Sequence, residues 1–584
     1  MKNEYFYNLS VTIIGIMTSV FILTTVGGLF HIPVNPFFVF IPLIGGIYYL
    51  RKKSPENIDF LKQFLILLLI IMSAYIISVS VWDSSWDGRS YHSALTVMLK
   101  NGWLPVYQNY EDFAKLCHIY PSSAFWGNCY MRFTEIIGAN VYKLTNLIES
   151  AKAVNFIILS AVFMYSFSVL GEFTKSKFIC LISSLIIILD PVCICQWFTN
   201  FIDLHTYFSF TLLILTIIKI EQKKETADMD LFMFANSVLM LAATKFTGCM
   251  YVFVICLIYF TYLILQRRGI KQYIKMLFIT GGLILLTCVS PLYTNLRDWG
   301  HPFHPVFGKN KINVIKETIP CNFDNMPRIK MFLLSNFFES VNATNSAESK
   351  KLGIPVRLKI PFTIKTESFC NYFYCADMRV GGFGYFWSGI LLLSLFYLPL
   401  IRFRNKNERN IFWLITTIIL ISTITNPHCW WARIVPQFWL FPVFILFFGL
   451  LQQNYKNKSA KILKSTLLLL IFLSFIVNSL IILLQNTQFN FRLTKQLKTP
   501  YNYIDSNKKD KDKIFLMVRT VTKKEVEKHC QNDETVIPHL EEYFGKDNII
   551  YVPYDENKII SGEYLPVQIT FVINTPCYFF KIDK

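Results

Sequence analysis

The sequence predicts a polytopic α-helical membrane protein with about 13 transmembrane helices and a small C-terminal α/β domain outside the membrane. Three observations predict this fold class. The chain of 584 residues is 53% hydrophobic, and its mean hydropathy is +0.40. Apolar stretches of roughly 17–22 residues, each long enough to cross a bilayer, recur along most of its length. After Gln485 the composition changes to a tail rich in Lys, Asp and Glu.

The candidate transmembrane spans follow from the apolar stretches. They are residues 9–30, 36–50, 62–81, 151–171, 177–196, 203–220, 231–246, 248–265, 272–292, 383–402, 409–425, 433–452 and 462–485. We interpret the stretch 231–265 as two short spans that turn near Gly248, and one long tilted helix is the alternative.

The distribution of charge orients these spans. The net charge of +19 would suit a nucleic-acid-binding protein, but Lys and Arg cluster in short connectors between apolar stretches. With the N-terminus in the cytoplasm, every connector placed inside carries Lys or Arg, whereas the short connectors around 31–35, 197–202 and 426–432 carry neither. This is the positive-inside pattern. It predicts a multi-pass protein of the cytoplasmic membrane, in contact with lipid and with no nucleic-acid partner.

This orientation places three long segments outside the cytoplasm. They are a first outer loop (82–150), a second outer loop (293–382) and the tail (486–584). The two loops belong to a transmembrane module of residues 1–485, and the tail follows that module. The tail has β-like runs at Lys513–Val518, Ile549–Val552 and Val567–Ile573, as expected for a small α/β domain. Its Cys530 and Cys577 are candidates for a disulfide, with free thiols as the default.

Amphipathic helices are expected in the first outer loop. Its stretch Phe125–Leu147 is apolar but interrupted by Asn128, Arg132 and Glu135. We interpret it as a helix on the membrane surface, since counting it as a span would reverse the side of everything after it.

The densest polar signal opens that loop, with the sequence WDSSWDGRSYH at residues 82–92. Ionisable groups at the membrane boundary are costly unless they are paired or used. Asp87 is a candidate general base or metal ligand, and Arg89, Tyr91 and His92 are candidate substrate-binding residues. The alternative is that Asp87 caps a helix and that the tryptophans anchor the interface.

Other polar groups fall on the same side of the membrane. Asp190 and Asp203 bracket the second outside turn; Asp190 precedes Pro191 and suits a helix kink, while Asp203 is either functional or a helix N-cap. Lys245 lies near the outer end of its span, where it would either bind an anion such as a lipid phosphate or extend to the headgroups.

Two further turns carry candidate substrate-binding residues. His428 and Arg433 lie at the outer face beside two indoles, and Arg433 is a second phosphate candidate because arginine binds phosphate through two parallel hydrogen bonds. An aromatic-belt anchor is the alternative there. Arg297 and His301 open the second outer loop beside two prolines, where a structural turn is the favoured interpretation.

The first outer loop resembles a known motif. Residues 87–91 (DGRSY), then Met98-Leu99 and Gly102-Trp103, are similar to the first-loop motif of GT-C membrane glycosyltransferases, in particular the aminoarabinose-transferase and protein O-mannosyltransferase branch. Residues 120–126 (YPSSAFW) resemble the Pro-Pro-x-x-Tyr-Trp segment of the same loop, and the predicted topology is similar over the whole chain. Gly88 departs from the branch, which usually has a second carboxylate there.

The resemblance implies a GT-C-like fold and an activity. A sugar would move from a polyprenyl-phosphate-linked donor to a glycan, lipid or protein acceptor at the extracytoplasmic face, as in cell-envelope polysaccharide biosynthesis. Asp87 would act as the base in an inverting transfer, and Asp203 would assist it or bind metal. Lys245, Arg433 or a divalent cation would stabilise the leaving phosphate.

Two other function classes are retained. A polysaccharide polymerase or ligase would depend on Arg and His in outer loops, and Arg297 and His301 would then matter more than Asp87. A lipid-linked-sugar flippase or transporter would need charges near the middle of spans and internally repeated broken helices. The sequence shows no such repeat.

Overall fold

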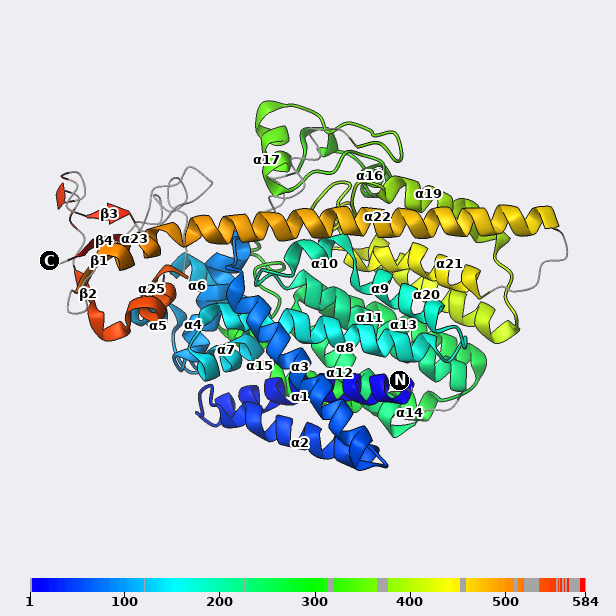
Figure 1. The fold of residues 1–584 in the computed structure, drawn as a ribbon, viewed down its shortest axis with the longest axis horizontal. Coiled ribbons are helices and arrows are strands. Elements are labelled where there is room, and N and C mark those ends of the chain that lie inside the picture. Colours follow the sequence, from blue (N-terminus) through cyan, green and yellow to red (C-terminus); the bar gives the residue numbers. More distant parts are fainter. Residues whose placement is uncertain are drawn as a thin grey trace.

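The computed structural model describes residues 3–119, 121–224, 227–313, 319–364, 376–451, 458–507, 513–518, 535–552 and 578–582, together with 555, 557–558, 561 and 564–566. It is predominantly helical, with one small sheet near the C-terminus. Figure 1 shows the helices running mostly along the long axis of the molecule, with the sheet at one end. The predicted fold class, a polytopic helical protein with a small C-terminal sheet domain, is confirmed.

Helices occur at all thirteen predicted stretches. Their bounds are α1 (Asn3–Leu29), α2 (Phe37–Lys53), α3 (Asn57–Ser80), α8 (Ala153–Leu170), α9 (Lys177–Ile188), α10 (Pro191–Gln196), α11 (Asp203–Lys223), α12 (Asp228–Thr244), α13 (Phe246–Gln266), α14 (Ile270–Thr287), α15 (Val289–Trp299), α19 (Trp387–Tyr397), α20 (Lys406–Thr425), α21 (Leu440–Leu450) and α22 (Lys458–Leu497). Within the described ranges, seven helical segments of 18 residues or more are apolar enough to cross a membrane, and shorter apolar helices accompany them.

The stretch 231–265 forms two helices, as the sequence predicts, and the break falls at Lys245, whose backbone is extended (φ −157°, ψ 151°). Gly248 is needed three residues later because a Cβ there would lie 1.9 Å from the carbonyl oxygen of Leu241 in α12. Two other predicted spans are interrupted. The span 272–292 divides at Cys288, between α14 and α15. The span 177–196 divides at Asp190-Pro191, where the Asp190 carboxylate accepts a hydrogen bond from the backbone N–H of Cys193 and so caps α10.

The first outer loop is folded into the body of the protein. It contains η1 (Gly88–His92), α4 (Ser93–Lys100), α5 (Tyr110–Leu116), α6 (Pro121–Cys129), α7 (Phe133–Thr145) and η2 (Ile148–Lys152). The prediction of one surface helix over 125–147 is wrong: the chain breaks at residues 130–132, and α7 is mostly buried. Burial is possible because Glu135 pairs with His92 at 2.5 Å.

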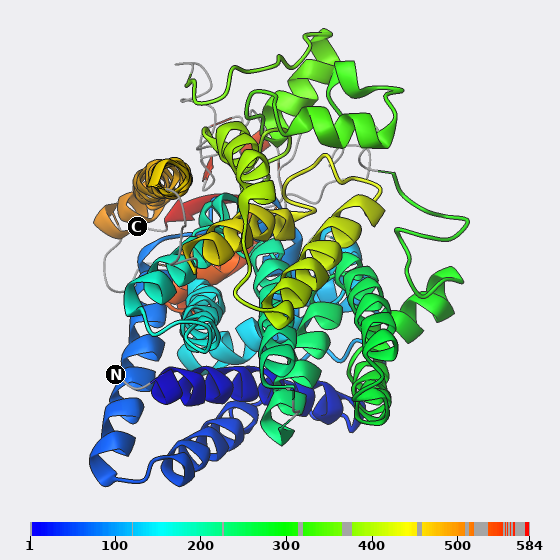
Figure 2. The same ribbon diagram turned by 90° about the vertical axis from the view of Figure 1, so that its right-hand side faces the viewer.

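The second outer loop contributes α16 (Arg328–Ser335) and α17 (Ala343–Leu352), and its last described segment, 376–382, returns to the helices. In Figures 1 and 2 this loop lies on one side of the molecule, close to α19. Two isolated β-bridges, Phe338 with Leu358 and Asn342 with Met378, hold it together.

Helix α22 connects the transmembrane module to the tail. It is 40 residues long, spans most of the molecule in Figure 1 and continues into α23 (Thr499–Asn507). Figure 2 shows it end-on beside the other helices. Its contacts with α10, α19 and α21 pack its apolar face against the bundle.

The tail forms a sheet with strand order β2-β1-β4-β3, and α25 (Val536–Phe544) accompanies it. Strand β1 (Ile514–Val518) pairs in parallel with β2 (Ile549–Val552) and antiparallel with β4 (Tyr578–Ile582), and β3 is Leu565–Pro566. The β-like runs at 513–518 and 549–552 therefore match strands. The predicted run Val567–Ile573 and both Cys530 and Cys577 lie outside the described residues.

Candidate active site

A cluster of charged side chains surrounds Arg433. Its guanidinium has Nη2 3.0 Å from Asp87, Nε 2.8 Å from Asp203 and Nη1 3.2 Å from Asp377. Asp87 comes from the first outer loop, Asp203 from the first turn of α11, and Asp377 from the second outer loop. Arg433 follows α20. Four distant parts of the sequence therefore meet at one cation.

Asp203 is the most deeply held of these carboxylates. Its side chain is 2% exposed, and besides Arg433 it contacts the ammonium of Lys245 at 2.5 Å and accepts a hydrogen bond from Nε2 of Gln196. The break between α12 and α13 puts Lys245 within reach. Lys245 therefore pairs with a carboxylate instead of extending to the headgroups, and Asp203 is not an N-cap, since that position is Ile202.

Asp87 is held more loosely. Its side chain is 21% exposed, its only ion pair within the described residues is with Arg433, and it makes no helix-capping hydrogen bond. Asp87 occupies the N-cap position of η1, as the alternative predicts, but its side chain does not cap the helix. Of the three carboxylates around Arg433, Asp87 has the most exposed side chain.

Aromatic rings line the guanidinium. The Cζ atom of Arg433 lies 4.6 Å from the ring centroid of Phe201 and 5.7 Å from that of Trp431. Trp431 is buried and donates a hydrogen bond from its indole N–H to Asp377 at 2.8 Å. It thus packs inside the site and is not an aromatic-belt anchor. Trp82 and Trp103 are also buried and are likewise not anchors.

The electrostatics of the cluster favour charged arginine and neutral tyrosine. Burial lowers the pKa of Arg433, but Asp377, Asp203 and Asp87 outweigh it and hold that pKa well above its usual value. Burial and the nearby Asp87 carboxylate raise the pKa of Tyr91 well above its usual value. Tyr91 therefore remains a neutral phenol beside Asp87 and is a potential hydrogen-bond donor.

The other candidate residues in the segment 82–92 have different neighbours. His92 is buried against Glu135 and lines a pocket of about 290 Å³ with Asn155, Phe201 and His205. This pocket borders the cluster through Phe201, whose ring also contacts Arg433. Burial lowers the pKa of Arg89, and the charges of Tyr501, Asp83 and Glu149 partly oppose this.

Three further candidates have partners other than Asp87, Asp203 and Arg433. Arg297 forms an ion pair with its neighbour Asp298 and donates to the carbonyl of Val106. His301 accepts a hydrogen bond from the backbone N–H of Phe303, as a structural turn would. His428 is bound to Asn426 through its backbone N–H, and burial lowers the pKa of its imidazole.

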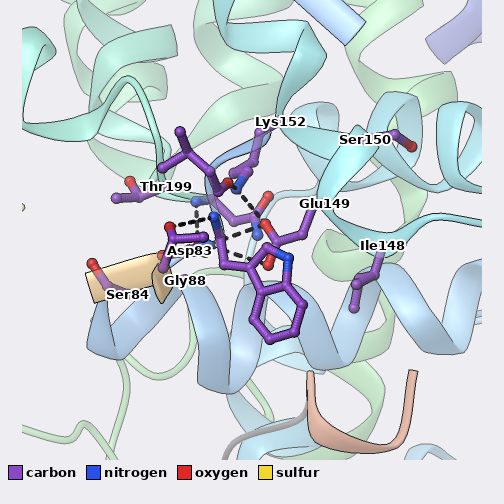
Figure 3. Close-up of polar contacts among 12 residues, drawn as sticks. Asp83, Ser84, Gly88, Ile148, Glu149, Ser150, Lys152 and Thr199 are labelled. Atoms are coloured by element: carbon purple, nitrogen blue, oxygen red, sulfur yellow. Dashed lines mark hydrogen bonds and ion pairs between the residues drawn. The ribbon is translucent and has the colours of Figure 1, made fainter. Parts of the chain in front are cut away.

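A second polar network fixes the segment before Asp87 (Figure 3). The backbone N–H of Asp83 donates to both carboxylate oxygens of Glu149, at 3.2 and 3.1 Å. Glu149 forms an ion pair with Lys152, which also donates to the carbonyl of Val81. The Asp83 carboxylate in turn accepts from the backbone N–H of Asn200 at 2.7 Å. The segment is thus tied to η2 and to the second outside turn.

The tail docks on the same segment. The indole of Trp82 stacks on the imidazole of His539 from α25, with centroids 3.7 Å apart and an interplanar angle of 6°. Nε2 of His539 lies 3.2 Å from Glu149, and Glu542 accepts a hydrogen bond from the backbone N–H of Ile148 at 2.6 Å. The tail domain therefore contacts the start of the loop that carries Asp87.

The side chains at the cluster do not form a metal site. In the ranges that the structure describes, no group of three or more His, Cys, Asp or Glu side chains could hold a metal ion. The three carboxylates that might have served are arranged around Arg433 and Lys245.

Sequence reasoning missed Asp377, Glu149 and His539. Asp377 belongs to the short sequence Asp-Met-Arg before a glycine pair, a pattern too common to single out. Glu149 and Lys152 lie at the start of an apolar span, and a charged pair at that place was a usable signal.

Comparisons with known proteins found limited similarity. No protein-family model matches the chain, and no curated protein matches it. Solved structures that match include the crystal structure of ArnT from Cupriavidus metallidurans bound to undecaprenyl phosphate. The chain is similar to it with a TM-score of 0.43 at 10% sequence identity, over 89% of this chain and 97% of that chain.

Proposed function

We propose that the chain is a membrane glycosyltransferase that moves a sugar from a polyprenyl-phosphate-linked donor to an acceptor at the extracytoplasmic face. Asp87 accepts the proton of an acceptor hydroxyl while that oxygen forms a bond to the anomeric carbon. The bond from the anomeric carbon to the phosphate oxygen breaks, its electrons stay with the phosphate, and polyprenyl phosphate leaves. Attack from the face opposite the phosphate inverts the configuration.

The contact between Asp87 and Arg433 carries this proposal. A general base needs a free oxygen and access to the acceptor. Asp87 has one ion pair and is partly exposed, whereas Asp203 is 2% exposed and is contacted by Lys245, Arg433 and Gln196. We therefore assign the base to Asp87, and we assign to Asp203 the positioning of the two cations.

Arg433 and Lys245 suit the charge that develops on the leaving phosphate. Preorganised cations aimed at such a charge are among the largest contributions to catalysis. The Nε–H of Arg433 has no aligned hydrogen-bond acceptor in the described part of the chain, although Asp203 lies 2.8 Å from the nitrogen. An anionic ligand oxygen would satisfy that donor. Tyr91, a neutral phenol beside Asp87, would donate to the acceptor or to the sugar.

The test compares Asp87→Asn with Asp112→Asn in the same outer loop. Asp112 is exposed on α5, so its substitution makes the same chemical change away from the cluster. Each protein is incubated in membranes with radiolabelled polyprenyl-phosphate sugars, and label transferred out of the lipid fraction is counted. We expect Asp87→Asn to lower transfer by about 10²-fold or more at normal protein abundance, and Asp112→Asn to transfer like the wild type. Full transfer by Asp87→Asn would refute the proposal.

The alternatives make different demands. A polymerase or ligase that uses Arg297 and His301 predicts loss of activity on substituting them. Arg297, however, contacts Asp298 and the Val106 carbonyl, and His301 accepts a hydrogen bond from Phe303. A transporter predicts charges in the middle of spans. The buried ion pair between Lys219 and Asp230 instead lies beside the connector that joins α11 to α12. No contact favours either alternative over the transferase.

A further inference from the structure

We infer that Asp377 is a positioning residue that fixes Arg433 for the transfer, so that the second outer loop completes the site. This inference rests on the proposed function and assigns a part in it to a loop that the sequence left without one. It follows from the way the guanidinium is held.

Each nitrogen of Arg433 faces a different carboxylate. Nη2 lies 3.0 Å from Asp87, Nε 2.8 Å from Asp203, and Nη1 3.2 Å from Asp377. A planar guanidinium contacted on three edges has one orientation in its plane. Without Asp377 the Nη1 edge loses its carboxylate, and the group can rotate away from the position in which Nη2 faces Asp87.

Asp377 does not need Arg433 for its own neutralisation. Its Oδ2 lies 3.1 Å from Nη2 of Arg379, and its Oδ1 accepts the indole N–H of Trp431 at 2.8 Å. Arg379 also lies over the Trp431 ring, 4.1 Å from the centroid. Asp377 is thus already paired and hydrogen-bonded before Arg433 is counted. The third contact therefore acts on Arg433 more than on Asp377.

The backbone around Asp377 is joined to the Arg433 turn. The N–H of Arg433 donates to the carbonyl of Met378 at 3.1 Å, and the N–H of Ala432 donates to that of Arg379 at 3.0 Å. Gly382 permits this approach, because a Cβ there would lie 2.6 Å from the Cβ of Ala432. The segment 376–382 and the Arg433 turn are therefore joined by main-chain hydrogen bonds.

The same segment is also tied to the second outside turn. Nε2 of Gln196, which donates to Asp203, donates at 3.2 Å to the carbonyl of Ala376 as well. One amide thus connects the second outer loop to the carboxylate that holds Lys245. Displacing the loop would disturb two sides of the cluster together.

The test measures kcat and KM for the lipid-linked donor in Asp377→Asn. We expect kcat to fall roughly 10- to 100-fold, because a misplaced catalytic group costs up to that much, while KM changes less than about 3-fold. Asp377→Glu should recover part of kcat. Trp431→Phe removes the indole N–H that holds Asp377 while keeping an aromatic ring, and should lower kcat by a smaller factor.

Asp324→Asn is the matched control. Asp324 lies in the same outer loop, pairs with Lys350 and is about half exposed, so this variant should keep wild-type kcat. Wild-type kcat in both Asp377→Asn and Trp431→Phe would overturn the inference. So would a loss in Asp377→Asn that follows protein abundance and is not eased by Asp377→Glu, since that pattern is purely structural.

Asp87→Asn in the same membranes separates this inference from the proposed function. If Asp87→Asn abolishes transfer while both Asp377→Asn and Trp431→Phe retain it, only the role of Asp377 fails. If Asp87→Asn retains transfer, the proposed function fails and the role of Asp377 in it fails too.

Discussion

The carboxylate of Asp83 occupies the space that a side chain on Gly88 would need. A Cβ on residue 88 would lie 2.2 Å from Oδ2 of Asp83 and 2.3 Å from the hydroxyl oxygen of Ser85. Asp83 cannot easily withdraw, because Ser85 and Asn200 both donate hydrogen bonds to its carboxylate. This contact gives a physical reason for glycine at the position where the resembled glycosyltransferases usually have a second carboxylate.

Gly88→Ala should therefore impair transfer. The added methyl group must displace either Asp83 or the backbone next to Asp87, and overpacking of this kind costs about 1–3 kcal/mol. We expect transfer to fall at least tenfold, measured as label leaving the lipid-linked donor. Gly282→Ala is the matched control, since nothing lies within 4 Å of a Cβ at that position of α14. Equal transfer by the two variants would contradict the packing argument.

The spans and the strands of the tail were predictable because their signals are local. A run of apolar residues predicts a span, and a short β-branched run predicts a strand. The charge of the connectors predicted that Asp87, Asp203, Lys245 and Arg433 lie on one side of the membrane. The structure does bring these four side chains together. Their roles stay predictions.

Contacts between distant segments could not be predicted in the same way. Asp377 meets Arg433 only because two loops pair through their backbones. Arg89 is two residues from Asp87 in sequence, yet the carboxylates that raise its pKa against burial are those of Asp83 and Glu149. Trp82 looked like an interface anchor, but its ring is covered by His539, more than 450 residues later. Such outcomes depend on packing that a single sequence does not display.

Lys245→Met should destabilise the protein and abolish transfer. It leaves the buried Asp203 carboxylate with Arg433 and Gln196 but without its closest cation, and breaking a buried pair costs about 3–5 kcal/mol. The melting temperature in detergent should fall by several degrees. Adding Asp203→Asn should restore much of that loss without restoring transfer, which separates stability from function.

Lys275→Met provides the control for that pair of variants. Lys275 is exposed on α14, so the same change of side chain there should leave both melting temperature and transfer unaltered. If Lys245→Met melts and transfers like Lys275→Met, the ion pair with Asp203 contributes neither stability nor function.

The sidedness of the membrane is testable with a reporter enzyme. Alkaline phosphatase needs disulfides and is active only outside the cytoplasm. Fused after Lys584 it should be active, and fused at the connector that begins with Arg267 it should be at least tenfold less active, because Lys and Arg favour the cytoplasmic side. Reversed activities would place the charge cluster on the cytoplasmic face, and equal activities would contradict the predicted orientation.

The docking of the tail should weaken at acid pH through His539. Burial lowers the pKa of His539, and the nearby Glu149 carboxylate only partly opposes this. An exposed histidine titrates near 6.5, so below about pH 6.5 the undocked state binds a proton that the docked state refuses. The contribution of His539 to docking is therefore complete above that pH and declines as the pH falls, by up to about 1.4 kcal/mol per pH unit. Glu542 of the same helix acts in the opposite direction, because burial raises its pKa to about 8.

Hydrogen exchange of residues 82–92 and 535–545 measures this docking directly. We expect protection of both segments to change together between pH 7 and pH 5, because Trp82 and His539 stack on each other. His539→Phe keeps an aromatic ring on Trp82 without a titratable group, so on acidification its protection should fall less than that of the wild type. His31→Phe, at an exposed ring that stacks on Tyr107, should behave like the wild type. An unchanged pH dependence in His539→Phe would show that another group controls the docking.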